Sequence, residues 1–384
     1  MRHEEILHRC FRCGYCKLPG DYTDLTCPSY LNYRFETFAP GGRMWLLRAW
    51  LEGEIKTSPR YQEILYACAA CGNCVQNCVF PKFKDYLLEA FIAGREQLVD
   101  QGAVPPAVRD VFKAVQVNGN PFKRPQSERG RWADGLGLAA YDGQEYLLYA
   151  GCVASYDERS QKMARAAAGL LKDLGLSFGL LGDRERCDGN EVRTMGENGL
   201  FEHLARENLA LFKELGVKKI VTLSPHSYHA FRREYPRFGP VPEVRHYSQV
   251  LAERLGGWKP ASGPGLKVVF HDPCYLGRHN EEYSAPRKIL RGLSGVTPVE
   301  MDRSRKNALC CGGGGGNFFT DILGRGPDAP ARVRAREALG TGADILVAAC
   351  PICLKMLDDA VKAEGLEERL RVMDLAELVV LRRG

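Results

Sequence analysis

The sequence predicts a multidomain α+β protein, in which an N-terminal helical domain precedes two similar α/β domains. Three observations support this: two tight groups of cysteines among helical patterns in residues 1–100, an alternation of short apolar runs with longer amphipathic ones from Tyr146 onward, and an internal repeat in that second part. The length of 384 residues allows two to three domains of about 150 residues. We place the domains at 1–100, 146–258 and 259–384, with a connecting segment at 101–145.

Composition and charge exclude several classes of protein. With 45% hydrophobic and 26% charged residues, the chain has the composition of a folded globular protein. The net charge of +6 is not gathered into runs of like charge, which argues against a nucleic-acid partner. The longest apolar stretch, residues 345–354, is well short of the roughly 20 residues that cross a bilayer. Acids stand where a secretory signal would be basic and apolar, so we expect a cytoplasmic location and no direct membrane span.

Helical patterns dominate the N-terminal domain. In residues 83–98, apolar side chains recur at three- and four-residue steps, which is typical of a helix with one buried face. Residues 44–51 are a second helical segment. The connecting segment 101–145 is rich in proline and glycine and contains one short helical pattern at 107–117.

The second part of the chain has the pattern of βαβ units, which predicts parallel sheets. We expect strands at 146–150, 219–223, 266–270 and 345–348, and helices at 160–174 and 200–215. Gly175 and Gly216 follow these two helices in the usual stop position.

The second part also contains an internal repeat. Three short motifs recur in the same order: Cys152 with Cys274, Cys187-Asp188 with Cys310-Cys311, and Ser224-Pro-His-Ser227 with Cys350-Pro-Ile-Cys353. The offset from Cys152 to Cys274 is 122 residues, and that from Ser227 to Cys353 is 126. Two similar domains of roughly 120 residues are therefore expected.

Eight of the fifteen cysteines form two motifs in residues 1–100, each with three cysteines at three-residue steps and a fourth further on. Such triplets bind three corners of an iron-sulfur cube, and in two-cluster ferredoxins the fourth cysteine binds the other cube. We predict two cubane [4Fe-4S] clusters, one held by Cys10, Cys13, Cys16 and Cys78, the other by Cys68, Cys71, Cys74 and Cys27. Zinc sites are a weaker alternative, because their pattern has paired cysteines without a third step.

Five further cysteines form a different set in the second repeat: Cys274, Cys310, Cys311, Cys350 and Cys353. Cys274 and Cys350 follow predicted strands, and ligands gather at the carboxyl ends of strands in open α/β sheets. The glycines at 312–316 permit close backbone approach beside an inorganic cluster, which we favour over a flexible linker or a dinucleotide-binding loop. We interpret His271 as a buried, hydrogen-bonded histidine, with a hydrogen bond to a cluster as the alternative.

These motifs resemble a known family. Cys274, the pair Cys310 and Cys311 with Gly312, and the later C-x2-C pair are similar to the cysteine-rich CCG domain of heterodisulfide reductase. Together with the N-terminal motifs they resemble the D-type subunit of that enzyme. The layout is also similar to iron-sulfur subunits of anaerobic glycerol-3-phosphate dehydrogenase, glycolate oxidase and lactate-utilisation complexes. The resemblance covers nearly the whole chain and implies a two-cluster ferredoxin-like domain followed by two CCG domains.

The resemblance also implies a third cofactor and partner subunits. In that family a complete CCG domain binds a noncubane [4Fe-4S] cluster or, on another proposal, zinc, so the five cysteines of the second repeat are the implied ligands. Flavin, quinone or another electron carrier needs a binding domain that this sequence does not show. We therefore expect a flavoprotein and other redox subunits as partners.

The first repeat departs from the family pattern. Only Cys152 and Cys187 remain of five thiols, and Asp188, Ser224 and Ser227 occupy the other places. Oxygen donors match a thiolate-rich cluster poorly, so we expect this domain to hold no metal and to serve in docking.

We favour an electron-transfer subunit of a larger redox complex, because the family's disulfide chemistry is associated with two complete CCG domains. The alternatives are a catalytic disulfide or thiol reductase that acts at the CCG cluster, and the iron-sulfur subunit of a flavin-dependent 2-hydroxy acid or glycerol-3-phosphate dehydrogenase. A zinc-bearing scaffold is disfavoured by the cysteine triplets. The sequence identifies no catalytic residue.

Overall fold

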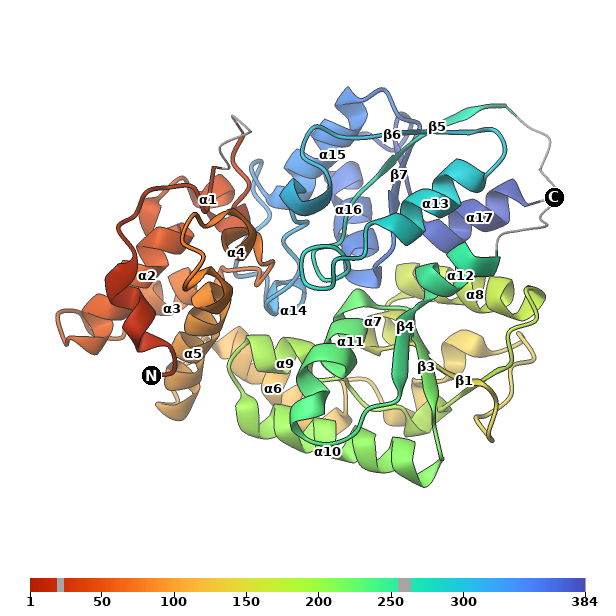
Figure 1. Ribbon diagram of the computed structural model, residues 1–384, viewed down its shortest axis with the longest axis horizontal. Coiled ribbons are helices and arrows are strands. Elements are labelled where there is room, and N and C mark those ends of the chain that lie inside the picture. The colour runs from red at the N-terminus through yellow and green to blue at the C-terminus, as the bar shows by residue number, and fades with distance from the viewer. Residues whose placement is uncertain (19–23, 255–263, 384) are drawn as a thin grey trace.

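The computed structural model describes residues 1–18, 24–254 and 264–383. A helical domain is followed by two α/β domains, each built around a parallel sheet of four strands (Figure 1). This arrangement confirms the predicted fold class. The predicted boundary between residues 258 and 259 lies outside the described residues, and the other domain limits stay predictions.

Helices form the N-terminal domain, as the sequence predicts. They are α1 (Pro28–Tyr33), α2 (Pro40–Leu51), α3 (Pro59–Tyr66), α4 (Asn73–Asn77) and α5 (Leu87–Asp100), and α6 (Pro106–Asn118) follows in the connecting segment. Proline opens α1, α2, α3 and α6, where its missing N–H costs no helical hydrogen bond. Ser58 caps α3 by accepting the Tyr61 N–H at 3.2 Å.

The first α/β domain contains a sheet with the strand order β2-β1-β3-β4, in which all pairs are parallel. Its strands are β1 (Tyr146–Tyr149), β2 (Phe178–Leu180), β3 (Lys219–Thr222) and β4 (Glu243–His246). Its helices are α7 (Cys152–Tyr156), α8 (Glu158–Asp173), α9 (Asn190–Thr194), α10 (Asn198–Glu214), α11 (Pro225–His229) and α12 (Tyr247–Arg254). Every residue of β1 is buried, as expected of a strand covered on both faces.

The second α/β domain repeats this topology with the order β6-β5-β7-β8, again all parallel. Its strands are β5 (Leu266–Phe270), β6 (Val296–Val299), β7 (Ile345–Ala348) and β8 (Arg371–Asp374). Its helices are α13 (Ser284–Gly292), α14 (Asn317–Thr320), α15 (Pro330–Gly340), α16 (Pro351–Ala363) and α17 (Leu375–Arg382). The equal strand order in the two domains agrees with the internal repeat.

The strands predicted from the sequence are the two central strands of each sheet. The edge strands β2, β4, β6 and β8 were not predicted. β6 contains Pro298, which cannot donate to a ladder and is tolerated at an edge. Edge strands are shorter or more polar than central ones, so they lack the continuous apolar run that marks β1 or β7.

In each sheet the chain leaves its two central strands in opposite directions. From β1 (or β5) it continues to one edge of the sheet, and from β3 (or β7) to the other edge. This reversal creates a crevice at the carboxyl ends of the two central strands. The two α/β domains pack together through polar contacts as well as apolar ones. The Tyr247 hydroxyl donates to the Asp374 carboxylate at 2.8 Å, and Arg159 pairs with Glu377 at 2.6 Å. No helix among the described residues is long and apolar enough to cross a membrane.

Candidate metal centres

The five cysteines of the second repeat meet in the crevice between β5 and β7. The Sγ atoms of Cys274 and Cys310 lie 3.7 Å apart, and those of Cys311 and Cys353 lie 3.4 Å apart. Cys350 is the residue before α16, and its thiol lies close enough to the Cys353 thiol for that group to lower its pKa. All five side chains are buried. The donors of this crevice are therefore suited to a thiolate-ligated iron-sulfur cluster.

Two of these cysteines favour the thiolate form, which is the form that binds metals. Hydrogen bonds from Cys310 and Cys353 lower the pKa of Cys311 well below its usual value. Burial opposes ionisation of Cys350, but hydrogen bonds from Cys353 and His226 lower its pKa to about 6. His226 belongs to the first repeat, so the two α/β domains both contribute to the electrostatics of this crevice.

His271 is buried against the same thiols. One of its ring nitrogens and the Sγ atoms of Cys311 and Cys353 all lie within 4.8 Å of one another. Arg334 Nε donates to His271 Nδ1 at 3.3 Å, so the proton of a neutral ring lies on Nε2. Nε2 has no hydrogen-bond partner among the described residues. One nitrogen is thus satisfied, as the sequence predicts, and the other is left to donate to a sulfur.

The glycines that follow Cys311 lie against the backbone of the second N-terminal motif. A Cβ on Gly314 would lie 2.6 Å from the Ala69 carbonyl oxygen, and one on Gly315 would lie 2.4 Å from the Cys68 carbonyl oxygen. Gly315 also has a φ of +64°, which other residues rarely adopt. Close approach to the backbone of the helical domain therefore explains Gly314 and Gly315, and the run joins the second repeat to that domain; approach to an inorganic cluster stays a prediction.

The fourth cysteine of each N-terminal motif lies beside the other motif. Burial raises the pKa of Cys78, and the neighbouring Cys13 and Cys10 raise it further. Burial likewise raises the pKa of Cys27, with a further increase from Cys71. These neighbours are the ones that the crossed ligand sets require, although ligation itself stays a prediction.

Cys16 and Cys74, the third cysteines of the two motifs, lie close to cysteines of both predicted ligand sets. Burial, with Cys27 next in importance, raises the pKa of Cys16 to about 12. Burial also raises the pKa of Cys74 well above its usual value, and Cys68 and Cys16 add to this. Because crowded thiols resist ionisation, a bound cation is needed to hold all of them as thiolates. The N-terminal residues are therefore suited to two adjacent iron-sulfur clusters.

The second N-terminal motif directly contacts the five-cysteine crevice. The Cys71 and Cys310 thiols lie close enough to interact, and this interaction raises the pKa of Cys71. Arg278 lies at the same contact: its Nε donates to the Cys71 carbonyl at 2.8 Å and its Nη1 to the Ala308 carbonyl at 2.6 Å. Burial lowers the pKa of Arg278, but Cys71, Cys274 and Cys310 outweigh it and raise the pKa above its ordinary value. A half-buried cation thus lies between the two sets of thiols.

Arg95 holds the three domains together near this contact. Its guanidinium donates to the Cys68 carbonyl at 2.6 Å and to the Thr194 carbonyl at 2.6 Å, and it approaches the Gly315 carbonyl at 3.5 Å. The side chain is 1% exposed. The role of Arg95 was not predicted from the sequence, although Arg95 follows the buried Phe91 by four residues on the same face of α5.

The first repeat places its equivalent residues in the crevice between β1 and β3. The Ser227 hydroxyl donates to the Asp188 carboxylate at 2.6 Å, and Ser224 caps α11 by accepting the His226 N–H at 3.2 Å. Cys152 and Cys187 are both buried there. The cavity at this place measures about 40 Å³. The structure therefore uses all three replaced ligand positions for hydrogen bonds within the protein.

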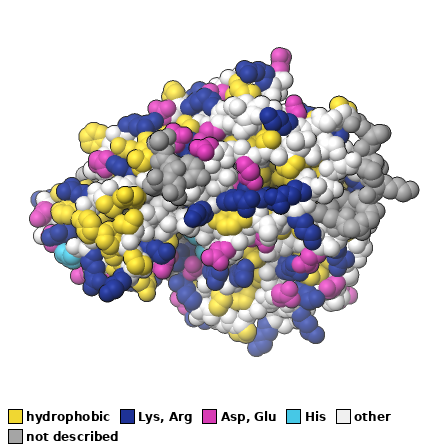
Figure 2. All heavy atoms as spheres, turned by 45° about the horizontal axis from the view of Figure 1, so that its top comes forward, with side chains coloured by type: hydrophobic (Ala, Val, Ile, Leu, Met, Phe, Trp, Pro, Cys, Tyr) yellow, Lys and Arg dark blue, Asp and Glu magenta, His cyan; other side chains and the backbone are white. Residues whose placement is uncertain are grey.

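Apolar side chains are exposed around the first N-terminal motif. Phe11 is 64% exposed and Val79 49%, and Cys13 is exposed as well. Figure 2 shows hydrophobic side chains gathered over the N-terminal domain, at the left of the view. The first motif is thus accessible, whereas the second is covered by the second repeat.

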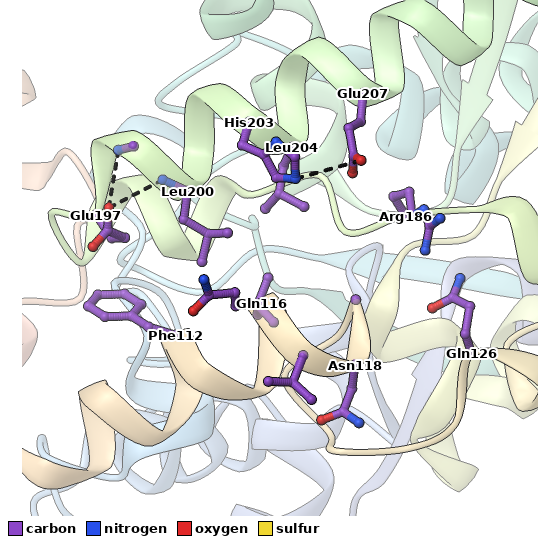
Figure 3. A pocket seen from close by; sticks show the side chains of 14 residues that line it. Phe112, Gln116, Asn118, Gln126, Arg186, Glu197, Leu200, His203, Leu204 and Glu207 are labelled. Carbon is purple, nitrogen blue, oxygen red and sulfur yellow. Dashed lines mark hydrogen bonds and ion pairs between the residues drawn. The ribbon is translucent and has the colours of Figure 1, made fainter.

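A cavity of about 690 Å³ lies between α6 and α10, away from the predicted ligands (Figure 3). Polar side chains such as Gln116, Arg186 and His203 line it, and His203 faces Glu207 at 3.6 Å. It contains none of the cysteines, so it carries no part of the predicted chemistry.

Two family models match the chain. A 4Fe-4S dicluster domain matches residues 6–80, and a cysteine-rich domain named CCG matches residues 146–232 and 268–358. The first match contains both N-terminal motifs, and the CCG matches coincide with the two repeats. The ferredoxin-like domain and the two CCG domains implied by the resemblance are therefore confirmed.

Similar proteins with assigned names belong to the same group of iron-sulfur oxidoreductases. The chain is 30% identical to the D-type subunit of the dihydromethanophenazine:CoB–CoM heterodisulfide reductase of Methanosarcina barkeri, over 97% of this chain and 93% of that protein. It is 35% identical to the EtfAB:quinone oxidoreductase of Syntrophomonas wolfei and 36% identical to FadF of Bacillus subtilis, named a probable iron-sulfur-binding oxidoreductase, over 83% of this chain in each case. The chain spans about half of these two relatives, 46% of each.

One solved structure shares the fold. A hypothetical protein from Helicobacter pylori matches 100% of this chain and 73% of its own, with a TM-score of 0.55 and 12% sequence identity.

Proposed function

Because the chain belongs to the family of iron-sulfur oxidoreductase subunits that includes the D-type subunit of heterodisulfide reductase, we propose that it transfers electrons within a larger redox complex. The proposed route runs from the first N-terminal cysteine motif through the second to the crevice of the second repeat. The proposed cofactors are two cubane [4Fe-4S] clusters and one further, noncubane [4Fe-4S] cluster, with the ligands expected from the sequence. A cytoplasmic location stays a prediction.

The observation that carries this proposal is the contact between Cys71 and Cys310. These residues belong to different predicted ligand sets and to different domains. Electron transfer between centres slows steeply with distance, so a direct contact between ligands favours it. A structural role for the clusters alone would not require the two sets to meet.

When bound, an iron-sulfur cluster supplies one-electron transfer at a potential set by its surroundings. The protein supplies the rest. Arg278 places a half-buried positive charge beside the thiol sets, which become more negative when electrons are added, and this charge favours the reduced state. Arg95 and the glycine run fix the distance between the domains. Burial of the five thiols in the crevice keeps water away.

We propose that the redox partner, a flavoprotein, docks over the first N-terminal motif. Cys13 is exposed there beside Phe11 and Val79, so a partner can bring its cofactor close to this motif. Exposed apolar side chains of this kind are typical of protein interaction sites. The second motif has no comparable access, because the second repeat covers it.

Two alternative functions differ from this proposal in where the electrons go. A disulfide or thiol reductase would act at the cluster of the second repeat, where Cys311 lines a cavity of about 290 Å³, so the assay described below separates it from the proposal. The iron-sulfur subunit of a flavin-dependent 2-hydroxy acid or glycerol-3-phosphate dehydrogenase uses the same electron route, so it differs only in the partner.

Reduction of the isolated chain, first alone and then with the proteins that co-purify with it, tests the proposal. We expect the reduced chain to turn over small disulfides only slowly, and electrons to enter rapidly only when the partner flavoprotein is present. Rapid catalytic disulfide reduction by the isolated chain would overturn the proposal in favour of the reductase. In the variant Cys71→Ser, the cluster of the second repeat should still be present but should be reduced slowly.

A further inference from the structure

The two cysteines left in the first repeat form a pair. Cys152 lies at the start of α7 and Cys187 lies in the loop before α9, yet their thiols are close enough to affect each other's pKa. Each side chain is 8% exposed, and both line the same small cavity. In the second repeat, the equivalent positions belong to the five-thiol set. Loss of three thiols has therefore left two neighbours that are free to react with each other.

A buried arginine makes the two thiols chemically unequal. Arg129 Nη1 and Nη2 each lie 3.5 Å from Cys152 Sγ, and Nη2 also bonds Glu185 Oε1 at 2.9 Å. Glu185 is held in turn by the backbone N–H groups of Ala150 and Gly151, both at 2.9 Å. The guanidinium therefore cannot turn away from the sulfur. It stabilises a thiolate at Cys152, as expected beside a cation.

The interaction between the two thiols changes their pKa values in opposite directions. A hydrogen bond from Cys187 lowers the pKa of Cys152, with help from Arg129 against burial. The same bond, together with burial, raises the pKa of Cys187 well above its usual value. Cys152 therefore favours the thiolate form more than Cys187 does.

The pair lies one layer of residues away from the crevice of the second repeat. Pro351 and Ile352 line the cavity of the pair, and both stand in α16 between Cys350 and Cys353. His226 lines the same cavity and also hydrogen-bonds Cys350. The cavity of about 40 Å³ is too small for an organic disulfide but sufficient for about one water molecule. Any electron donor or acceptor for the pair must therefore be within the protein.

We propose that Cys152 and Cys187 are a redox-active pair that exchanges two electrons with the iron-sulfur cluster of the second repeat. In the oxidised pair, an S–S bond joins the two residues. Two electrons, delivered one at a time from the reduced cluster, break this bond. One proton from solvent is taken up at Cys187, and Cys152 is left as the thiolate beside Arg129. This inference rests on the proposed electron-transfer function.

Peptide mapping of the whole chain tests the pair without an activity assay. Trypsin cleaves after Arg131, Arg159, Arg186 and Arg193, so each cysteine of the pair lies alone in a peptide, 132–159 or 187–193. The chain is oxidised or reduced without oxygen, alkylated, and digested without reductant. We expect the two peptides to be linked in the oxidised chain and separately alkylated in the reduced one. Absence of the linked peptides under every oxidising condition would refute the pair.

Counting electrons tests the exchange. In an anaerobic reductive titration, the oxidised wild-type chain should take up two more electrons than Cys152→Ser, and Cys187→Ser should match Cys152→Ser. Both variants should retain the iron content of the wild type, because neither residue is a proposed ligand. An equal electron count in the wild type and the variants would refute the exchange. If the visible spectrum shows that the cluster of the second repeat is reduced while the linked peptides persist, the inference fails but the proposed function stands. If that cluster is not reduced either, the proposed function fails.

Discussion

Replacing Gly315 by alanine should weaken the contact between the second repeat and the second N-terminal motif. The new Cβ would lie 2.4 Å from the Cys68 carbonyl oxygen, so the backbones must separate by about 1 Å to reach an ordinary contact distance. An alanine at a φ of +64° also costs about 1–2 kcal/mol. With about 1–3 kcal/mol for the overpacked contact, the free energy of unfolding should fall by about 2–5 kcal/mol.

Gly365 provides the matched control. Its φ is also +64°, but a Cβ added there would meet no atom within 4 Å. Gly365→Ala should therefore lose only about 1–2 kcal/mol, the conformational cost. Urea unfolding by linear extrapolation measures both losses, and spectroscopy measures how fast the second-repeat cluster is reduced. We expect only Gly315→Ala to slow that reduction. Equal stability losses and equal reduction rates in the two variants would refute the proposed close approach.

Three further predictions concern the clusters and the docking site. Arg278→Gln should lower the reduction potential of a neighbouring cluster by about 100 mV. One charge at about 6 Å, with an effective dielectric constant of about 20, contributes about 3 kcal/mol. A redox titration that finds no shift would contradict this prediction. Cys311→Ser should remove about four irons and the corresponding EPR signal while the N-terminal signals persist; unchanged iron content would reject the ligand. Phe11→Ser should slow reduction by the partner without altering iron content, and an unaffected rate would move the docking site elsewhere.

The sequence was sufficient to predict the parts of the fold that have a strong local signal. The central strands β1, β3, β5 and β7 are apolar and largely buried, so their runs were recognisable. The edge strands were missed because partial exposure removes that signal; β4, with the sequence Glu-Val-Arg-His, resembles a loop as much as a strand. Cysteine spacing likewise identified both N-terminal motifs and the family.

The residues that connect the sites could not be predicted, because their roles depend on contacts distant in the sequence. Arg278 bonds the Cys71 carbonyl across 207 residues, and Arg129 reaches Cys152 from the connecting segment. His226 lies in the first repeat but hydrogen-bonds Cys350 of the second, which no local pattern indicates. A buried or half-buried arginine leaves no periodic pattern of its own, so these arginines became apparent only with the packing of the three domains.

The central claim is that electrons cross from the second N-terminal motif to the crevice of the second repeat at the contact of Cys71 with Cys310. Rapid-freeze EPR after mixing with a reduced donor tests it most directly. The claim predicts that signals of the N-terminal clusters develop first and that the signal of the second-repeat cluster follows. Cys71→Ser, which also alters the N-terminal cluster that Cys71 is predicted to bind, should delay the second event. If the second-repeat cluster were reduced equally fast in the wild type and in Cys71→Ser, the proposed route would be contradicted.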